Sequence, residues 1–217
     1  SGNPCSAVYR GTSAFSEPET DAVRNFILSR EFINVLHYHS YSNLLIHSWG
    51  DGSYPLEPDL TTLREIGTEM TRFNGYLVGT GIETVGYGVN GDAVDWSYGA
   101  ADLISYTPEV GSFSDNFWPS ENRVLPLCQD QVHSNSIFAL ISGSDYIIYD
   151  KIFNNNYPSL DDTVSISLVI QNRGLTNSSG SVVLDIIPLD DLNNINVDNI
   201  TIESLPARAT DTINVLL

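Results

Sequence analysis

Hydrophobic positions along the first two thirds of the chain follow two spacings, which predict alternating helices and strands. Residues 17–30 and 58–73 carry apolar side chains on one helical face, and in the second segment these are Leu60, Leu63, Ile66 and Met70. Short apolar runs at 32–38, 43–49, 76–78 and 103–110 predict strands, the first of them central and buried. A last helix is expected over 122–142, despite the proline at position 126.

The first predicted helix has a recognisable start. Ser16 with Glu19 three positions later forms a capping-box pattern, and Pro18 falls in the first turn, where its missing N–H costs nothing. The sequence therefore predicts that the Ser16 side chain caps this helix.

After residue 145 the pattern changes to Ile and Val alternation that is broken at short intervals by turn-forming residues. The runs 164–170 and 181–186 alternate cleanly, and clusters of Asn, Asp, Gly and Ser separate them. This pattern predicts a small Ig-like β-sandwich, although about 70 residues supply fewer strands than a complete one needs. We therefore expect an α/β domain over residues 1–145 and an Ig-like β module, incomplete in strands, over 146–217.

The charge balance argues against several classes of partner. Twenty-seven acidic residues against nine basic ones give a net charge of -18, and the only lysine is Lys151. Such a surface repels nucleic-acid phosphates and anionic lipid headgroups, so we expect neither nucleic-acid binding nor membrane insertion. No apolar run reaches the roughly 20 residues that span a bilayer. A lysine-poor, acidic surface fits an exported protein in salty water, where screening relieves self-repulsion. Any targeting signal is expected upstream of residue 1. The two cysteines, Cys5 and Cys128, leave open a bridge or two separate thiols.

Three clusters carry residues suited to chemistry. His37 and His39 share one face at the end of a predicted strand, Tyr87 lies in a glycine-rich loop, and Glu109 ends another buried strand. Each cluster also has a purely structural interpretation. The histidines could be structural residues at a strand end, and the glycine-rich loop could be a turn leading into a short helix. Glu109 could be a buried carboxylate that is paired or hydrogen-bonded. Taken singly, none of the three establishes a site.

In their order and spacing, these segments resemble the carboxypeptidase A-like zinc peptidases (family M14), with bacterial secreted members the most similar. The resemblance covers about residues 3–142. It is carried by Asn3-Pro4-Cys5-Ser6, Tyr9-Arg10-Gly11, Ala14-Phe15-Ser16-Glu17-Pro18-Glu19, His39-Ser40-Tyr41-Ser42, Tyr87, Asp95-Trp96-Ser97-Tyr98, Thr107-Pro108-Glu109 and Phe117-Trp118-Pro119.

The resemblance implies a fold and a set of roles. It implies a mixed sheet flanked by helices, the phosphorylase/hydrolase-like carboxypeptidase fold, with its N-terminal strands missing from this chain. His39 matches the last zinc ligand, and Glu109 matches the base that deprotonates the attacking water. Tyr87 matches a mobile tyrosine that closes over the substrate, and Ser40 with Tyr41 matches residues lining the groove. Peptides are the implied substrates.

The resemblance also implies where specificity is set. Val94 falls at the floor of the pocket for the C-terminal side chain, where an acidic residue would select basic substrates. Val94 therefore predicts an apolar preference, while Asp92 in the same loop could still pair with arginine or lysine. We expect apolar or mixed specificity.

Two zinc ligands of the family are missing. No histidine here is followed three positions later by glutamate, as the family's first zinc motif requires. The resemblance also implies an Asn-Arg pair that grips the substrate's terminal carboxylate and an arginine that steadies the oxyanion, and both are missing. The resemblance places all of these upstream of Asn3. With one of three protein ligands, the isolated chain is expected to be inactive. The exposed sheet is expected to bind the missing N-terminal half or a second copy.

Other classes of function stay open. The alternative is a non-catalytic binding or surface-adhesion protein that keeps the carboxypeptidase scaffold. The tail could carry adhesion, although only Phe153 and Tyr157 offer aromatic surface near its start. Asp161-Asp162 and Asp190-Asp191 could contribute to a calcium site or be solvated loop carboxylates. A secreted or cell-surface location is expected in either case.

Overall fold

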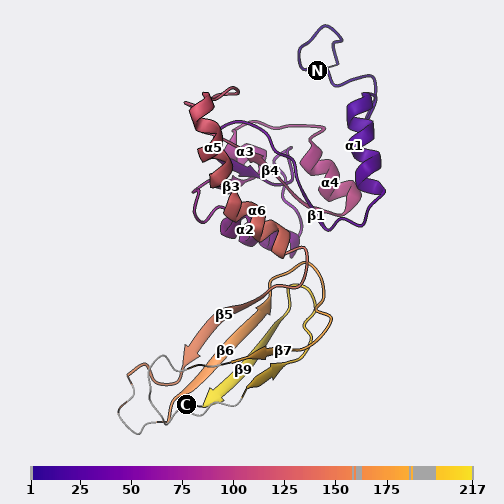
Figure 1. The fold of residues 1–217 in the computed structure, drawn as a ribbon. Helices are drawn as coiled ribbons and strands as arrows, with labels where there is room; N and C mark the ends of the chain where they lie inside the picture. The colour runs from indigo at the N-terminus through magenta and orange to yellow at the C-terminus, as the bar shows by residue number, and fades with distance from the viewer. Residues whose placement is uncertain (1, 158, 160–162, 186, 188–198, 217) are drawn as a thin grey trace. The chain divides into compact units, whose positions relative to one another are not determined.

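The chain forms two compact units, Ser1–Phe138 and Ala139–Leu217 (Figure 1). The computed structural model describes residues 2–157, 159, 163–185, 187 and 199–216. The boundary expected after residue 145 falls inside the second unit. Each unit is described by itself below.

A four-stranded mixed sheet forms the centre of the first unit. Its strand order is β1-β4-β2-β3, with β1 parallel to β4, β2 antiparallel to β4, and β3 parallel to β2. The mixed α/β architecture expected from the sequence is therefore confirmed. The strands are β1 (Asn34–Leu36), β2 (Leu44–Ile46), β3 (Leu77–Gly79) and β4 (Ile104–Glu109).

The prediction of a buried central strand over 32–38 is wrong. β1 lies at an edge of the sheet, and Phe32, Ile33 and Tyr38 around it are 39%, 38% and 48% exposed. Its bonds to the neighbouring strand use alternate residues, as in His37 N–H to Tyr106 O and His39 N–H to Pro108 O, both 2.9 Å. An apolar run looks the same in the sequence whether its strand has neighbours on one side or on both. Only the order of strands in the sheet therefore shows that β1 is an edge strand.

Six helices surround this sheet within the described residues. The predicted helices 17–30 and 58–73 are confirmed, and the short helix expected after the glycine-rich turn is also present. The single helix expected over 122–142 is instead two helices, which separate at Gln131, while Pro126 lies inside the first of them. The helices are α1 (Pro18–Leu28), α2 (Asp59–Met70), α3 (Gly81–Thr84), α4 (Ala93–Ala101), α5 (Glu121–Asp130) and α6 (Val132–Leu140).

The predicted cap of α1 is wrong as well. Glu17 is the N-cap residue and makes no side-chain capping bond, while Ser16 Oγ donates to Glu17 Oε1 at 3.0 Å. A capping box does occur at α3, where Thr80 and Glu83 bond to each other's backbone N–H groups. The S/T-x-x-E spacing is the same at both places, so the backbone conformation before the helix decides which one forms a cap.

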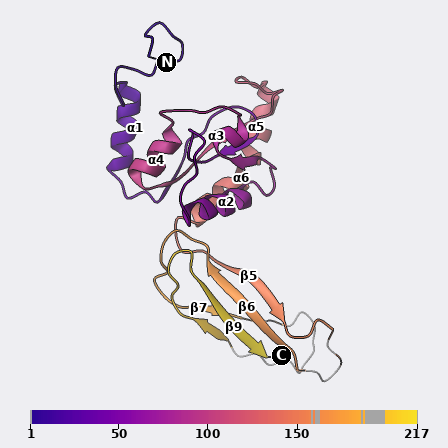
Figure 2. The same ribbon diagram turned by 180° about the vertical axis from the view of Figure 1, so that it is seen from behind.

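Helices cover both faces of the sheet. Successive residues of β4 point to opposite sides, and their side chains contact a different helix on each side. Ser105 donates to the carbonyl of Val94 in α4 at 2.9 Å. Tyr106 points the other way, where its hydroxyl donates to Leu63 O in α2 at 2.6 Å and its ring packs against Phe138 of α6. α1 lies beside α4 in both views (Figure 1, Figure 2).

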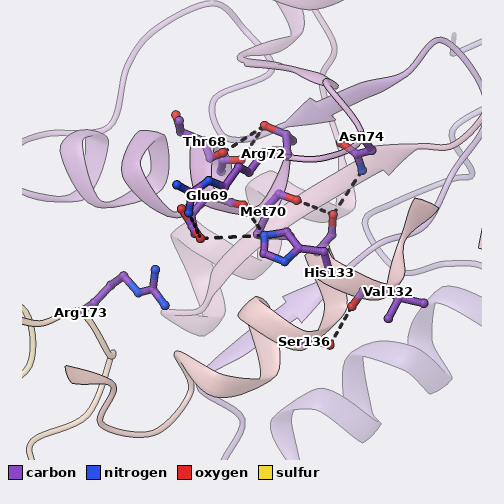
Figure 3. A network of polar contacts seen from close by, with 12 residues as sticks. Thr68, Glu69, Met70, Arg72, Asn74, Val132, His133, Ser136 and Arg173 are labelled. Atoms are coloured by element: carbon purple, nitrogen blue, oxygen red, sulfur yellow. Dashed lines mark hydrogen bonds and ion pairs between the residues drawn. The ribbon is translucent and has the colours of Figure 1, made fainter. Parts of the chain in front are cut away.

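A polar network joins the C-terminal end of α2 to the start of α6 (Figure 3). The imidazole of His133 bonds to the carbonyl of Glu69 through Nε2 at 2.9 Å, and Ser134 Oγ donates to Met70 O at 2.7 Å. Asn74 Nδ2 donates to Ser134 Oγ at 3.3 Å. These bonds tie carbonyls in the last turn of α2 to side chains at the start of α6, so His133 has a structural role here.

The second unit is built from two small antiparallel sheets. The predicted strands 164–170 and 181–186 are confirmed in β6 and β7, and residues from both sheets form one hydrophobic cluster around Leu168, Ile170, Ile202 and Val215. The Ig-like sandwich stays a prediction. Asp161-Asp162 and Asp190-Asp191 lie outside the described residues. The sheets are β5-β6-β9 and β7-β8, from β5 (Tyr146–Phe153), β6 (Ser165–Asn172), β7 (Val182–Leu184), β8 (Ile200–Ile202) and β9 (Thr210–Leu216).

Candidate functional site

His39 and Glu109 meet just beyond β1 and at the end of β4. They occupy opposite positions in a parallel bridge, held by His39 N–H to Pro108 O and Val110 N–H to His39 O, each 2.9 Å. Residues at opposite positions in a parallel pair point to the same face. His39 Nδ1 accordingly lies 3.1 Å from Glu109 Oε2. The structure thus brings together an imidazole and a carboxylate that are 70 residues apart in the sequence.

The two side chains differ in exposure. The His39 ring is 63% exposed, whereas the Glu109 side chain is only 12% exposed. An exposed imidazole is open to a further ligand, and a largely buried carboxylate beside it can accept a proton from a nearby water. This pairing suits hydrolytic chemistry.

Ser40 and Tyr41 lie beside this pair. Behind them the chain turns back, and the N–H groups of Ser42 and Asn43 both donate to Gly111 O. The Tyr41 ring packs edge-on against Phe113 and Phe117 of the loop after β4, with centroids 5.6 and 4.9 Å apart. Tyr41 therefore belongs to an aromatic group next to the candidate site, and sequence reasoning missed its partner Phe113. A cavity of about 680 Å³ adjoins this region and is lined by Tyr38, His39, Ser40, Val110, Phe117, Leu127, Cys128, Gln131 and Asn135.

Tyr87 lies in the loop between α3 and α4 and is 62% exposed. Gly86 and Gly91 on either side have φ angles of +81° and +82°, which only glycine adopts without strain. No hydrogen bond or ring contact joins Tyr87 to His39 or Glu109 within the described residues. The loop is held at its middle by Val89 N–H, which donates to Gly50 O at 2.8 Å.

Asp92 and Val94 have structural roles at the start of α4. The Asp92 carboxylate caps the helix by accepting the Val94 N–H at 3.1 Å. The Val94 side chain is fully buried, and its carbonyl accepts both Ser48 Oγ at 3.3 Å and Ser105 Oγ at 2.9 Å. This start of α4 is thereby fixed to the same face of the sheet as Glu109.

Two titrating groups on this face are shifted. Burial lowers the pKa of His37, partly opposed by the nearby Asp92 carboxylate, so its imidazole favours the neutral form. Burial raises the pKa of Asp95, although Gly50 N–H donates to both of its oxygens at 3.1 and 3.0 Å. The His37 ring is held by α4 through a 2.8 Å bond between Nε2 and Ser97 Oγ. His37 therefore packs against α4 and does not reach the exposed imidazole of His39 through any hydrogen bond.

The described residues do not form a zinc site on their own. No group of three His, Cys, Asp or Glu side chains that could hold a metal occurs among them. His39 is a single exposed donor, and a catalytic zinc needs three protein ligands. Cys5 and Cys128 are both exposed and unpaired, so the bridge left open by the sequence is not formed. Among the described residues, no helix is long and apolar enough to cross a membrane.

Comparison with known proteins identifies the family. Residues 1–134 match the zinc carboxypeptidase family, so the chain belongs to that family. Human mast cell carboxypeptidase A is 34% identical over 137 residues, which are 59% of this chain and 32% of the relative. Carboxypeptidase B of Helicoverpa zea is 33% identical over 146 residues, which are 60% of this chain and 33% of the relative.

A solved structure agrees. Bovine thrombin-activatable fibrinolysis inhibitor, in complex with tick carboxypeptidase inhibitor, superposes with a TM-score of 0.57 at 26% identity. The match covers 64% of this chain and 50% of that one. The chain thus spans about a third of the curated relatives named above, all from animals; the resemblance to bacterial secreted members stays a prediction.

Proposed function

We propose that this chain is one part of a zinc-dependent exopeptidase that removes residues from the C-termini of peptides. The observation that carries the proposal is the 3.1 Å approach of His39 Nδ1 to Glu109 Oε2 in a chain of the zinc carboxypeptidase family. In this role His39 is one zinc ligand. Glu109 is the general base that takes a proton from the attacking water and delivers it to the leaving amine. When bound, zinc lowers the pKa of its water and polarises the scissile carbonyl.

The substrate groove is proposed to run past Ser40 and Tyr41. Their position beside Glu109, with Tyr41 packed on Phe117, supports this. Tyr87 is proposed to close over the C-terminal end, supported by its exposure and its flanking glycines. Val94, which is apolar and fully buried near the start of α4, supports an apolar or mixed preference. Asp92 already accepts a backbone N–H, which weakens its claim to pair with a basic substrate.

The remaining zinc ligands are proposed to come from an N-terminal half of the same domain, or from a self-associated copy. The edge position of β1 supports this, because within the described sheet β1 pairs with a strand, β4, on one side only. The coverage of only about a third of each curated relative named above is consistent with a larger whole. Export to the cell surface or beyond is proposed from the acidic, lysine-poor composition.

Activity of the whole protein that contains this chain tests the proposal. The zinc-loaded protein is assayed on an acylated dipeptide with a free C-terminus and on the same dipeptide with a C-terminal amide. Hydrolysis of the first only is expected. Glu109→Gln should lower kcat by roughly 10²–10⁴-fold with zinc content unchanged. His39→Ala should lower zinc content itself, and Glu121→Gln in the exposed first turn of α5 is the matched control.

The isolated 217-residue chain completes the experiment. It should bind zinc weakly and hydrolyse nothing, and sedimentation will show whether it self-associates. Full activity of Glu109→Gln would show that Glu109 is not the general base. Peptidase activity of the isolated monomeric chain would contradict the expectation that one zinc ligand is too few for catalysis. Zinc and peptide binding without hydrolysis by the whole protein would favour a binding protein instead.

A further inference from the structure

A nearly buried ion pair closes the loop that follows β4. Asp115 is 5% exposed, and its two oxygens accept Arg123 Nε at 2.7 Å and Arg123 Nη2 at 3.2 Å. Such two-pronged bonds between arginine and a carboxylate are stronger and more directional than a single neutral hydrogen bond. Asp115 Oδ2 also accepts the backbone N–H of Ser112 at 2.9 Å and its hydroxyl at 2.7 Å. The carboxylate therefore ties the start of the loop to α5.

Arg123 lies where a helix disfavours a positive charge. It is the third residue of α5, and the N–H groups of the first turn carry partial positive charge. Its bonds to Asp115 offset this cost. Among the described residues, Arg123 is the only cation paired with Asp115, so removing the guanidinium leaves a nearly buried carboxylate without a counter-charge. The ion pair is therefore a specific feature of this loop.

The same loop also fixes the backbone that follows Tyr41. Gly111, directly before Ser112, accepts the N–H groups of Ser42 and Asn43 at 2.7 and 2.9 Å. These two residues come directly after Tyr41 in the chain. The segment that carries Tyr41 is thus bonded to the same end of the loop that Asp115 holds.

The aromatic group beside the candidate site consists of Tyr41, Phe113 and Phe117. The last two flank Asp115 in the sequence, and their ring centroids lie 5.6 and 4.9 Å from that of Tyr41. Phe113 is 76% exposed and Phe117 is 69% exposed, so the protein core does not hold either ring in place. Their positions depend on the backbone of the loop, and the loop in turn is closed by Asp115.

We propose that Arg123 and Asp115 are positioning residues, whose ion pair holds the aromatic group in place for the part of a peptide that precedes the scissile bond. This inference rests on the proposed function, in which the substrate groove runs past Ser40 and Tyr41. Within the described chain, no hydrogen bond joins Arg123 or Asp115 to the candidate catalytic pair. The ion pair therefore acts on the binding of longer peptides and leaves the chemical step unchanged.

Peptides of two lengths test the inference. The zinc-loaded whole protein is assayed on an acylated dipeptide and on an acylated tetrapeptide that ends in the same two residues. The tetrapeptide should have the lower KM, because it reaches the aromatic group. Arg123→Gln should raise the KM of the tetrapeptide by roughly three- to tenfold, which is the scale of one aromatic contact. The kcat of both peptides and the KM of the dipeptide should not change.

Three further variants separate positioning from general damage. Arg123→Lys keeps the charge without the planar pair of donors, so it should raise the KM of the tetrapeptide less than Arg123→Gln does. Phe113→Ala should also raise this KM, and adding it to Arg123→Gln should cause no further rise, because the arginine acts through the ring. Arg72→Gln, at the ion pair with Glu69 on α2, is the matched control and should change neither KM.

Digestion with chymotrypsin gives a result that does not depend on peptidase activity. In the whole protein, Arg123→Gln should speed cleavage after Phe113 and Phe117, mapped by mass spectrometry, and Arg72→Gln should not. An unchanged rate of this cleavage, or a KM that rises equally for both peptides or for neither, would overturn the inference and leave the peptidase proposal intact. If the parent cleaves neither peptide, the proposed function fails and the role in peptide binding fails with it, while the digestion still shows whether the ion pair holds the loop.

Discussion

The buried imidazole of His47 predicts that the chain loses stability in mild acid. His47 is fully buried, and its Nδ1 bonds to the carbonyl of Ser48 at 2.7 Å, so Nδ1 carries the proton of the neutral ring. Nε2 is buried without a partner in the described residues. Burial lowers the pKa of His47, with Glu83 nearby raising it and Arg64 lowering it.

The direction of the change in stability with pH depends on whether the folded or the unfolded chain binds the proton first. Because the pKa in the folded state lies below the unfolded value of about 6.5, the unfolded chain takes up this proton first as the pH falls. The stability contributed by neutral His47 is therefore fully present above pH 6.5 and is lost as the pH falls toward the folded-state pKa. One proton bound only by the unfolded state at pH 5.5 costs at most about 1.4 kcal/mol relative to pH 7.5.

Urea unfolding of the parent chain and of His47→Leu at pH 7.5 and 5.5 measures this effect. Leucine cannot titrate, so the variant should lose up to about 1.4 kcal/mol less than the parent between the two pH values. His37→Asn is the companion variant, because the pKa of His37 is also lowered by burial but is opposed by Asp92. Identical pH dependence of the parent and His47→Leu would refute the reasoning, since it would mean that His47 titrates alike in both states.

Two further substitutions, one in each unit, test the packing, and a third serves as a control. Gly67→Ala in α2 places a Cβ 2.6 Å from Val78 Cγ1, so either the Val78 side chain or the helix must shift, and we expect a loss of about 1–3 kcal/mol in chemical denaturation. Gly180→Ala, where a Cβ meets nothing within 4 Å, should change stability little, and an equal loss there would contradict the steric argument. Asn172→Ala removes a fully buried amide that donates to three carbonyls and accepts two N–H groups. The expected cost is about 3 kcal/mol in thermal unfolding of the second unit, and a cost below 1 kcal/mol would mean that water replaces the amide.

Local features with a clear period were predictable from the sequence. The apolar stripe of Leu63, Ile66 and Met70 identified α2, because a 3.6-residue period admits few other structures. The alternation over 164–170 identified β6 for the same kind of reason. The cap at Ser16 was not predictable, because its S/T-x-x-E spacing fits a cap only when the preceding backbone lets the hydroxyl reach the helix N–H groups.

The candidate site was likewise predictable in part. The order of the segments around His39, Tyr87 and Glu109 was enough to suggest the family, and residues 1–134 match it. The pairing of His39 with Glu109 across the sheet was not predictable. A period of two places each residue on one side of its strand but does not say which strands are neighbours.

The sequence by itself determined the kinds of elements, the change of pattern after the α/β part, the acidic surface and the chemical types at the site. Only the tertiary structure decided that β1 is an edge strand and that β4 is its parallel neighbour. It also decided that an imidazole and a carboxylate 70 residues apart lie 3.1 Å from each other. The physical reason is that side-chain period is a local property of the backbone, whereas strand pairing depends on long-range packing of the whole unit.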